Sequence, residues 1–235
     1  EIVAKRHGIT RQMQDEMAYR SNMRASAAIR DGKFKEEIIP VTTKVYGPGG
    51  PKTMTVSDDE GPRPETTMEG LAKLKPAFDQ QGTVTAGNSS QTSDGAAAAV
   101  LMAAEVAQKK GLQPLAYIRH YAVAGVPPDV MGIGPIPAVR KLMQKSGLKV
   151  SDIDLFELNE AFAAQGAYCM RELGLDVEKT NVNGGAIALG HPLGATGCVL
   201  VAKLLHEMKR RQARRGVVTM CIGGGMGAAM LFERA

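Results

Sequence analysis

The chain has 235 residues, with 29 lysines and arginines against 24 aspartates and glutamates, giving a formal net charge of +5. This length allows one large or two small domains with a substantial core. The mild positive charge suits an anionic small molecule such as a phosphate-bearing cofactor. Basic residues interleaved with stacking aromatics are missing, which argues against nucleic acid as a partner. Abundant Gly, Ala and Met without any Trp favour α/β layers over an all-β sandwich.

The three cysteines, Cys169, Cys198 and Cys221, are an odd number without CxxC spacing. This pattern favours a reducing compartment and argues against a disulfide framework or a zinc site. The four histidines show no HExxH spacing, so we expect no metal. No apolar run is long enough to span a bilayer. The sequence begins with Glu1 and carries no signal-peptide pattern, so we expect it to start partway through a longer protein.

The first 110 residues alternate between helical and turn-rich patterns. A helical pattern covers residues 1–33, with Thr10 as an N-cap and Gly32 at its end. The patterns that follow predict a short strand at 37–41, a mobile Gly/Pro-rich excursion at 46–64 and a short helix at 66–76. Residues 82–90 predict a short strand entering a polar glycine turn, and Ser93 and Asp94 predict the cap of a helix over 95–110 that Gly111 ends. Such a loop can bind an anion or simply turn a corner, and for Ser90 both interpretations stay open.

The second half alternates strands with helices, which predicts an α/β fold. The patterns predict strands at 115–126, 152–158, 216–222 and 228–232, and helices at 138–146 and from 159 to 173. Gly147 and Gly174 end the helices, and Asn159 stands where an N-cap belongs. Lys and Arg gather between 203 and 215, where we expect a solvated helix end rather than a binding patch. Residues 223–228 match GxGxxA after a strand, but too little chain follows for a dinucleotide site.

A turn-rich stretch at 181–197 contains five glycines, with His191 near its centre. Glycine costs backbone entropy, so such a run indicates close backbone approach to a ligand or to another segment. An amphipathic helix follows, which places the imidazole in a glycine-lined cleft at a helix N-terminus.

Cys221 ends a predicted strand directly before three glycines, whose N–H groups can stabilise an oxyanion. A thiol with an ordinary pKa near ~8.5 can act as both acid and base. A lone buried cysteine is more often inert and a lone histidine more often structural, so context carries the assignment of His191, Cys221 and Asn159.

Several blocks resemble the signatures of the thiolase family, and the likeness covers essentially the whole chain. They are residues 63–70, 85–90, 159–163 (Asn-Glu-Ala-Phe-Ala), 183–197 with Gly-His-Pro at 190–192, and 221–227. The resemblance implies a layered α-β-α-β-α fold. Residues 1–75 would then be the remainder of an inserted loop domain, 76–118 the last strand and helix of the N-terminal thiolase domain, and 119–235 the C-terminal thiolase domain.

The resemblance also implies a subtype. Residues 61–64, 88–91 and 126–132 are most similar to peroxisomal-type 3-ketoacyl-CoA thiolases, whereas 134–138 and 221–225 are more like acetyl-CoA acetyltransferases. The implied localisation is peroxisomal, with mitochondrial or cytoplasmic as alternatives. The implied assembly is a homodimer or homotetramer.

By resemblance, the reaction is cleavage of a 3-ketoacyl-CoA by CoA, with no permanently bound cofactor and coenzyme A as a substrate. His191 would take a proton from a nucleophilic cysteine, and Cys221 would protonate the departing acetyl-CoA enolate. His191 and a water held by Asn159 would form the oxyanion hole for the thioester oxygen, and the N–H of Gly223 would form the other hole with the N–H of the nucleophile. Arg63 and Ser90 match positions that contact CoA, although on spacing alone Arg63 looks like a plain surface residue.

One departure is serious: no cysteine of this chain matches the family's acylated nucleophile. We therefore expect the chain alone to be inactive, with the N-terminal half required. One alternative is a Cys-His-Asn hydrolase built from Cys221, His191 and Asn159, which would need its nucleophile at the start of a helix. Another alternative is a non-catalytic CoA-binding chain.

Overall fold

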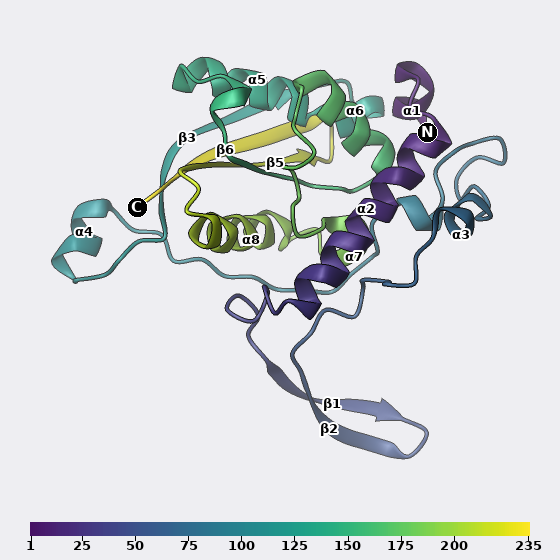
Figure 1. Cartoon of the computed structure of the whole chain (residues 1–235), viewed down its shortest axis with the longest axis horizontal. Coiled ribbons are helices and arrows are strands. Elements are labelled where there is room, and N and C mark those ends of the chain that lie inside the picture. The colour runs from purple at the N-terminus through teal and green to yellow at the C-terminus, as the bar shows by residue number, and fades with distance from the viewer.

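The computed structural model describes all 235 residues. Its centre is a four-stranded mixed sheet in the order β3-β6-β5-β4 (Figure 1). The strands are β3 (Ala116–Gly125), β4 (Leu155–Leu158), β5 (Arg215–Ile222) and β6 (Met226–Arg234). β6 is antiparallel to both of its neighbours, whereas β4 and β5 are parallel. The predicted strands are therefore confirmed, with β6 extending beyond both ends of 228–232.

Helices cover both faces of this sheet, which gives the layered α/β fold. α5 (Pro135–Ser146) and α6 (Ala163–Leu173) lie on one face and α8 (Thr196–Arg211) on the other (Figure 1). Successive residues of β5 point to opposite faces of the sheet. Val217 therefore packs in the hydrophobic cluster on the α5 side, and Val218 packs in the cluster on the α8 side.

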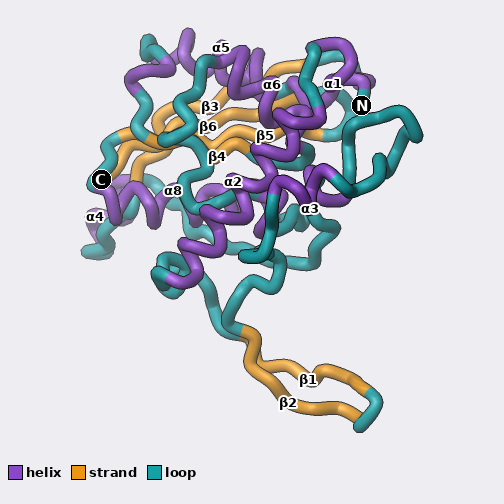
Figure 2. Tube along the Cα trace, turned by 45° about the vertical axis from the view of Figure 1, so that its right-hand side comes forward, coloured by secondary structure: helices purple, strands orange, loops and turns teal.

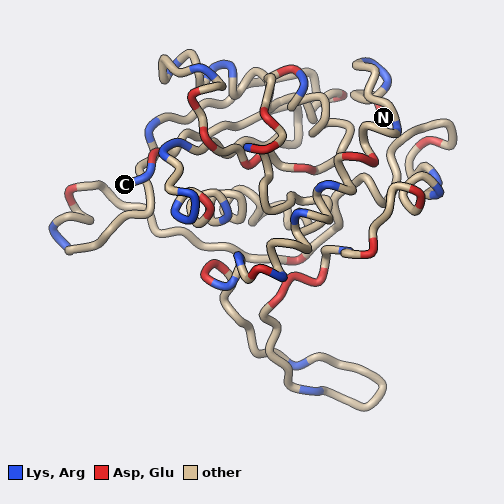
Figure 3. The backbone as a smooth tube through the Cα atoms, viewed as in Figure 1, with Lys and Arg blue, Asp and Glu red and all other residues tan.

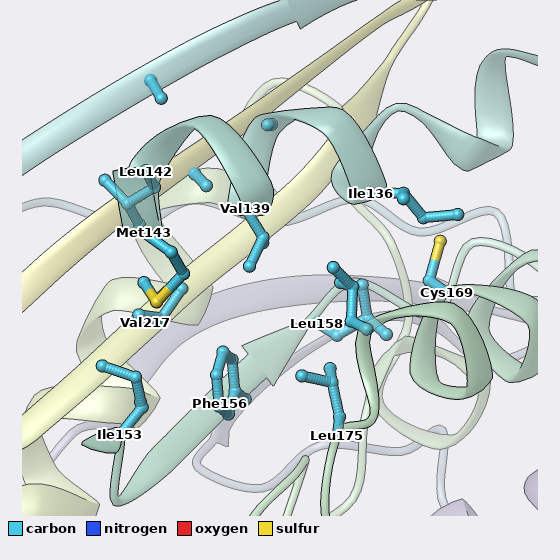
Figure 4. Packing of buried hydrophobic residues seen from close by; sticks show 14 of the residues in the cluster. Ile136, Val139, Leu142, Met143, Ile153, Phe156, Leu158, Cys169, Leu175 and Val217 are labelled. Atoms are coloured by element: carbon cyan, nitrogen blue, oxygen red, sulfur yellow. The ribbon is translucent and has the colours of Figure 1, made fainter. Parts of the chain in front are cut away.

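The larger core cluster lies between the sheet and the two helices α5 and α6. Val139 and Leu142 of α5 meet Phe156 and Leu158 of β4 there (Figure 4). Each fully buried aliphatic side chain contributes about 1.5–3 kcal/mol. Phe156 and Leu158, just before Asn159, are thus held by core packing as well as by the sheet.

Local signals predicted several helix ends correctly. Thr10 caps α2 (Arg11–Arg30), since its hydroxyl accepts the N–H of Met13 at 3.2 Å. α5 ends at Gly147 (φ 70) and α6 at Gly174 (φ 62). The long N-terminal helix is interrupted, because Gly8 (φ 62) ends a separate α1 (Ile2–His7) before Thr10.

The predicted strand at 37–41 is wrong, and the excursion predicted at 46–64 contains regular structure. An antiparallel hairpin forms instead, from β1 (Val41–Gly47) and β2 (Gly50–Val56), and it projects from the body (Figure 2). Thr and Val alternate with other residues on both sides of a Gly-Pro-Gly-Gly turn, which is a hairpin signal that the Pro and Gly content obscured. The short helix α3 (Met68–Ala72) lies within its predicted range and is capped by Thr67.

The predicted strand and helix between 82 and 110 are also wrong. Residues 82–90 contain only two isolated bridges, Thr85 with Pro76 and Ser89 with Phe162, and a 3₁₀ turn, η1 (Ala86–Asn88). The helix is limited to α4 (Ala104–Lys109), while residues 93–103 have no regular secondary structure, with Val100 86% exposed. A helix takes most of its stability from packing its apolar face, and this face is exposed here.

The remaining elements are short helical segments in the connections between the strands and the longer helices. They are η2 (Pro128–Ile133), η3 (Val150–Asp152) and α7 (Ala186–Leu189). α8 ends at Gln212 (φ 54), earlier than Gly216. Basic residues lie along this helix (Figure 3). Ion pairs partly neutralise the charge at its end, since Lys209 pairs with Glu36, and Arg210 and Arg211 pair with Glu207. None of the helices combines the length and the apolar character that crossing a bilayer requires.

Candidate active site

Parallel pairing of β4 with β5 brings two of the predicted residues to one edge of the sheet. Leu158 is in register with Thr219, and the N–H of Asn159 donates to the Thr219 carbonyl at 3.0 Å. β5 then continues to Cys221, so the chain leaves β4 at Asn159 beside the end of β5. Ligand sites of open α/β sheets lie at such carboxyl ends of strands.

The prediction that Asn159 caps α6 is wrong. Phe162 occupies the N-cap position. The side-chain amide of Gln165 forms hydrogen bonds at both ends of the link between β4 and α6. Its Oε1 accepts the Phe162 N–H at 3.1 Å, and its Nε2 donates to the Asn159 carbonyl at 3.1 Å. The Asn159 side chain is therefore free of any capping role.

His191 reaches the Asn159 side chain from the far end of α7. Gly190 (φ 93) turns the chain there, and the N–H of His191 donates to the Gln91 carbonyl at 3.3 Å. The ring Nε2 lies 3.3 Å from Nδ2 of Asn159. Burial lowers the pKa of the imidazole, so the ring is neutral at pH 7 and can accept a proton.

The second polar atom of the Asn159 amide has no partner. The residue is fully buried, and its Oδ1 makes no hydrogen bond. An unsatisfied buried acceptor costs roughly 1–3 kcal/mol, which a bound water or a ligand donor would recover. This atom therefore marks a place where a donor can bind next to the imidazole.

Cys221 lies inside β5 opposite Gly227 and is 7% exposed. Burial raises the pKa of its thiol, so the group is protonated at pH 7 and can give a proton before it takes one. The turn that follows adopts left-handed backbone at Gly224 (φ 88) and Gly225 (φ 95). A Cβ on Gly225 would clash with the Val126 carbonyl, so the close approach of two backbones requires glycine there.

The structure thus brings Asn159 and His191 into contact and places Cys221 on the strand beside Asn159. No hydrogen bond joins the imidazole to the thiol; the two are connected through Asn159 and the β4–β5 pairing. Gly223 is exposed at the end of β5.

The two predicted CoA contacts lie in different surroundings. The N–H of Ser90 donates to the Ala161 carbonyl at 3.0 Å, which places Ser90 beside the start of α6. Arg63 is exposed, and its N–H donates to Oδ1 of Asn22 at 3.0 Å. No hydrogen bond joins either side chain to His191.

Gln91 connects these segments and was missed from the sequence. Its Nε2 donates to the carbonyls of Gly61 at 2.9 Å and of Ala188 at 3.1 Å, while its own carbonyl accepts from His191. Gln91 therefore links the chain before Arg63 with the end of α7. Its position directly after Ser90 was the available signal.

Hydrogen bonds between buried polar groups hold the glycine-rich stretch at 181–197 in place. The Glu160 carboxylate accepts from Ser21 Oγ at 2.6 Å and from Nδ2 of Asn181 at 2.8 Å. Asn181 (φ 48) also bonds the N–H and the carbonyl of Leu158, at 2.9 and 2.8 Å. The turn after α6 is thereby tied to the end of β4 and to α2.

A buried ion pair supports the same stretch from α8. Nζ of Lys203 lies 3.0 Å from the Glu157 carboxylate and donates to the Gly184 carbonyl at 2.6 Å. Burial raises the pKa of the Glu157 carboxyl, and the Lys203 ammonium acts against that shift. Sequence reasoning missed this pair, although a glutamate inside an apolar strand is a signal of a buried partner. No group of three His, Cys, Asp or Glu side chains is arranged to bind a metal.

Comparison with known proteins gives two family matches. The thiolase N-terminal domain family matches residues 1–105, and the thiolase C-terminal domain family matches residues 112–234.

Individual relatives agree with these matches. A 3-ketoacyl-CoA thiolase from Bacillus subtilis is 58% identical over 99% of this chain and 61% of its own length. The peroxisomal 3-ketoacyl-CoA thiolase A of Mus musculus is 59% identical over 99% of this chain and 55% of its own length. The chain therefore spans just over half of the length of the relatives it matches.

Solved structures share the fold over nearly the whole chain. An acetyl-CoA acetyltransferase from Bacillus anthracis superposes with a TM-score of 0.95 at 49% identity, covering 99% of this chain and 58% of the other. Human mitochondrial 3-ketoacyl-CoA thiolase in complex with CoA superposes with a TM-score of 0.89 at 41% identity, covering 99% and 57%.

Proposed function

We propose that this chain, which belongs to the thiolase family, supplies the acid–base part of a 3-ketoacyl-CoA thiolase. The observation that carries the proposal is the contact of His191 with Asn159 beside the strand that bears Cys221. The reaction is cleavage of a 3-ketoacyl-CoA by CoA into acetyl-CoA and a shortened acyl-CoA. Relatives 58% and 59% identical to the chain carry the name 3-ketoacyl-CoA thiolase, which supports this substrate class.

His191 acts first as a base. Its neutral Nε2 takes the proton of a nucleophilic thiol, and the thiolate attacks the 3-keto carbon to form a tetrahedral adduct. The carbon–carbon bond then breaks, which leaves an acyl group on the nucleophile and the enolate of acetyl-CoA. Cys221, protonated because burial raises the pKa of its thiol, gives its proton to the enolate carbon.

Cys221 then acts as a base in the second half of the reaction. Its thiolate takes the proton of an incoming CoA thiol, whose sulfur attacks the acyl group and displaces the thiolate of the nucleophile. The shortened acyl-CoA leaves, and the nucleophile recovers its proton from His191. A water held by Oδ1 of Asn159 and the N–H of Gly223 stabilise the oxyanions. Loss of one such donor costs about 10²- to 10³-fold in rate.

None of the three cysteines fits the part of the nucleophile. Cys169 is fully buried, and burial raises the pKa of its thiol far above the ordinary value. Cys198, in the first turn of α8, lies in no block that resembles the family's nucleophile segment, and in this proposal Cys221 serves in proton transfer. We therefore propose that the chain alone is inactive and that the nucleophile comes from an N-terminal half. In this proposal residues 1–75 and 76–118 complete that half, and 119–235 form the C-terminal domain.

Reconstitution tests the proposal directly. The chain is assayed for acetoacetyl-CoA thiolysis alone and after fusion to the part of the Bacillus subtilis relative that it does not match. We expect turnover only from the fusion, and loss of that turnover in matched His191→Ala and Cys221→Ala fusions. Activity of the isolated chain, or an inactive folded fusion, would overturn the proposal.

The proposed CoA site includes Arg63 and Ser90 in addition to the catalytic residues. The mitochondrial relative was solved with CoA, which supports CoA as the substrate of this site. Binding of CoA to the fusion, measured by calorimetry, should weaken in Arg63→Ala, whose side chain is exposed and free of structural bonds. Unchanged affinity would remove Arg63 from the site.

Assembly and localisation follow the same analogy. We propose a homodimer or homotetramer, testable by sedimentation of the fusion. We propose a peroxisomal location, since plant and rodent relatives named peroxisomal are 57–59% identical, although a bacterial relative is 58% identical. Imaging of the tagged protein in cells of its source organism decides between a peroxisomal location and a location elsewhere in the cell.

A second candidate function is acetyl-CoA C-acetyltransferase, which makes acetoacetyl-CoA. The high structural similarity to the Bacillus anthracis enzyme favours it. Rates on long-chain 3-ketoacyl-CoA against acetoacetyl-CoA separate the two candidates. The hydrolase alternative loses its structural basis, because Cys221 lies within β5 and not at the start of a helix. An inactive fusion that still binds CoA would favour the non-catalytic CoA-binding chain.

A further inference from the structure

Thr196 is a buried hydroxyl residue in direct contact with the imidazole of His191. It is the first residue of α8 and is 2% exposed. Its Oγ1 lies 2.6 Å from Nδ1 of His191 and 2.9 Å from the carbonyl oxygen of Pro192. The same carbonyl accepts the N–H groups of Ala195 at 2.8 Å and Thr196 at 2.9 Å, so it is held in place at the start of the helix.

These contacts fix where the protons lie. A threonine hydroxyl has one proton to give, and a backbone carbonyl can only accept. The Thr196 proton goes to Pro192, so the Thr196 oxygen is an acceptor for Nδ1–H of the ring. On the other side of the ring, Nδ2 of Asn159 is a donor, and it requires a lone pair on Nε2.

The opposite arrangement leaves groups in conflict. If Thr196 donated to Nδ1, the neutral ring would carry its proton on Nε2. That proton would face the Nδ2 donor of Asn159 across 3.3 Å. Both contacts of the ring therefore agree on a single tautomer, protonated on Nδ1 and free on Nε2.

We propose that Thr196 is the positioning residue that holds His191 in the Nδ1–H tautomer and so presents the lone pair of Nε2 to the reacting groups. The inference rests on the proposed function for its consequence in catalysis, although the tautomer itself is a property of the folded chain. A hydroxyl suits the task because it orients the ring without adding charge. A carboxylate in its place would stabilise the imidazolium and raise the pKa of the ring, so that less of it would be in the neutral form that accepts a proton.

The first test is the tautomer, which needs no turnover. Long-range ¹H–¹⁵N spectra are recorded on the chain with ¹⁵N-labelled histidine, and His191→Gln assigns the signal. We expect a protonated Nδ1 and an unprotonated Nε2 at pH 8. Thr196→Ser should keep this pattern, whereas Thr196→Val, which has the same shape without the hydroxyl, should lose it. A protonated Nε2 in the unsubstituted chain, or an unchanged pattern in Thr196→Val, would overturn the proposal.

The second test is kinetic and uses the fusion described above. Misplacement or the wrong tautomer of a general base costs on the order of 10²-fold in rate. We expect that loss in kcat for Thr196→Val with little change in KM, and recovery of most activity in Thr196→Ser. Equal rates for Thr196→Val and the unsubstituted fusion would contradict the inference. If the unsubstituted fusion is inactive, the proposed function fails while the tautomer result still decides the role of Thr196.

Discussion

The ion pair between Lys203 and Glu157 offers the sharpest test of how the site is supported. Both side chains are buried, at 6% and 2% exposure of their residues, and Lys203 also bonds the Gly184 carbonyl. In Lys203→Met the side chain keeps a similar length, but the carboxylate loses its only cation within bonding distance. Removing one partner of a buried pair costs about 3–5 kcal/mol.

That loss is a large share of the roughly 5–15 kcal/mol by which a domain is stable. For a chain of this size it corresponds to a fall in melting temperature of about 6–20 °C, at ~2–4 °C per kcal/mol. Glu157 would then hold its proton in the folded state, because burial raises the pKa of its carboxyl. The folded variant binds more protons than the unfolded one, so its stability falls as the pH rises above the ordinary pKa of glutamate.

Urea denaturation of Lys203→Met at pH 5.5 and 8 measures both effects. The matched control is the double variant Lys203→Met with Glu157→Gln, which removes both charges and should recover much of the stability. If Lys203→Met unfolds within about 1 kcal/mol of the unsubstituted chain, or loses the same stability at both pH values, the buried pair does not support the site as argued.

Three further predictions concern separate residues. Burial lowers the pKa of His191, so the acid limb of thiolysis by the fusion should lie below the ordinary histidine pKa near ~6.5; a limb above that value would contradict a neutral base. Burial raises the pKa of Glu37 to about 7, and its Oε2 has no partner, so Glu37→Gln should stabilise the chain at pH 8 by about 1 kcal/mol and not at pH 4. Equal effects at both pH values would refute this. Gly225→Ala should destabilise the folded chain by ~2 kcal/mol or more, because the new Cβ would clash with the Val126 carbonyl. Gly147→Ala, at a helix end with open space around it, should destabilise the chain by only about 1 kcal/mol. Thermal melts of both variants check the difference.

Features that depend on neighbouring residues could be predicted from the amino-acid pattern alone. Thr10, Gly147 and Gly174 act where their patterns predicted, since a cap bonds groups within one helical turn. The strands of the second half were predictable because burial on a sheet leaves a short, bounded apolar pattern. His191 and Cys221 were recognisable because glycine-rich turns mark places where backbones approach closely.

Contacts between segments far apart in the chain depend on how the elements pack, which no local pattern contains. Whether residues 95–110 form a helix depends on packing of their apolar face, which local propensity does not contain. Asn159 looked like a helix cap, yet the register of β4 on β5 turned it toward His191. Thr196 and Lys203 read as ordinary residues of an amphipathic helix, and their roles arise because α8 is buried against the glycine-rich stretch, where each polar group must find a partner.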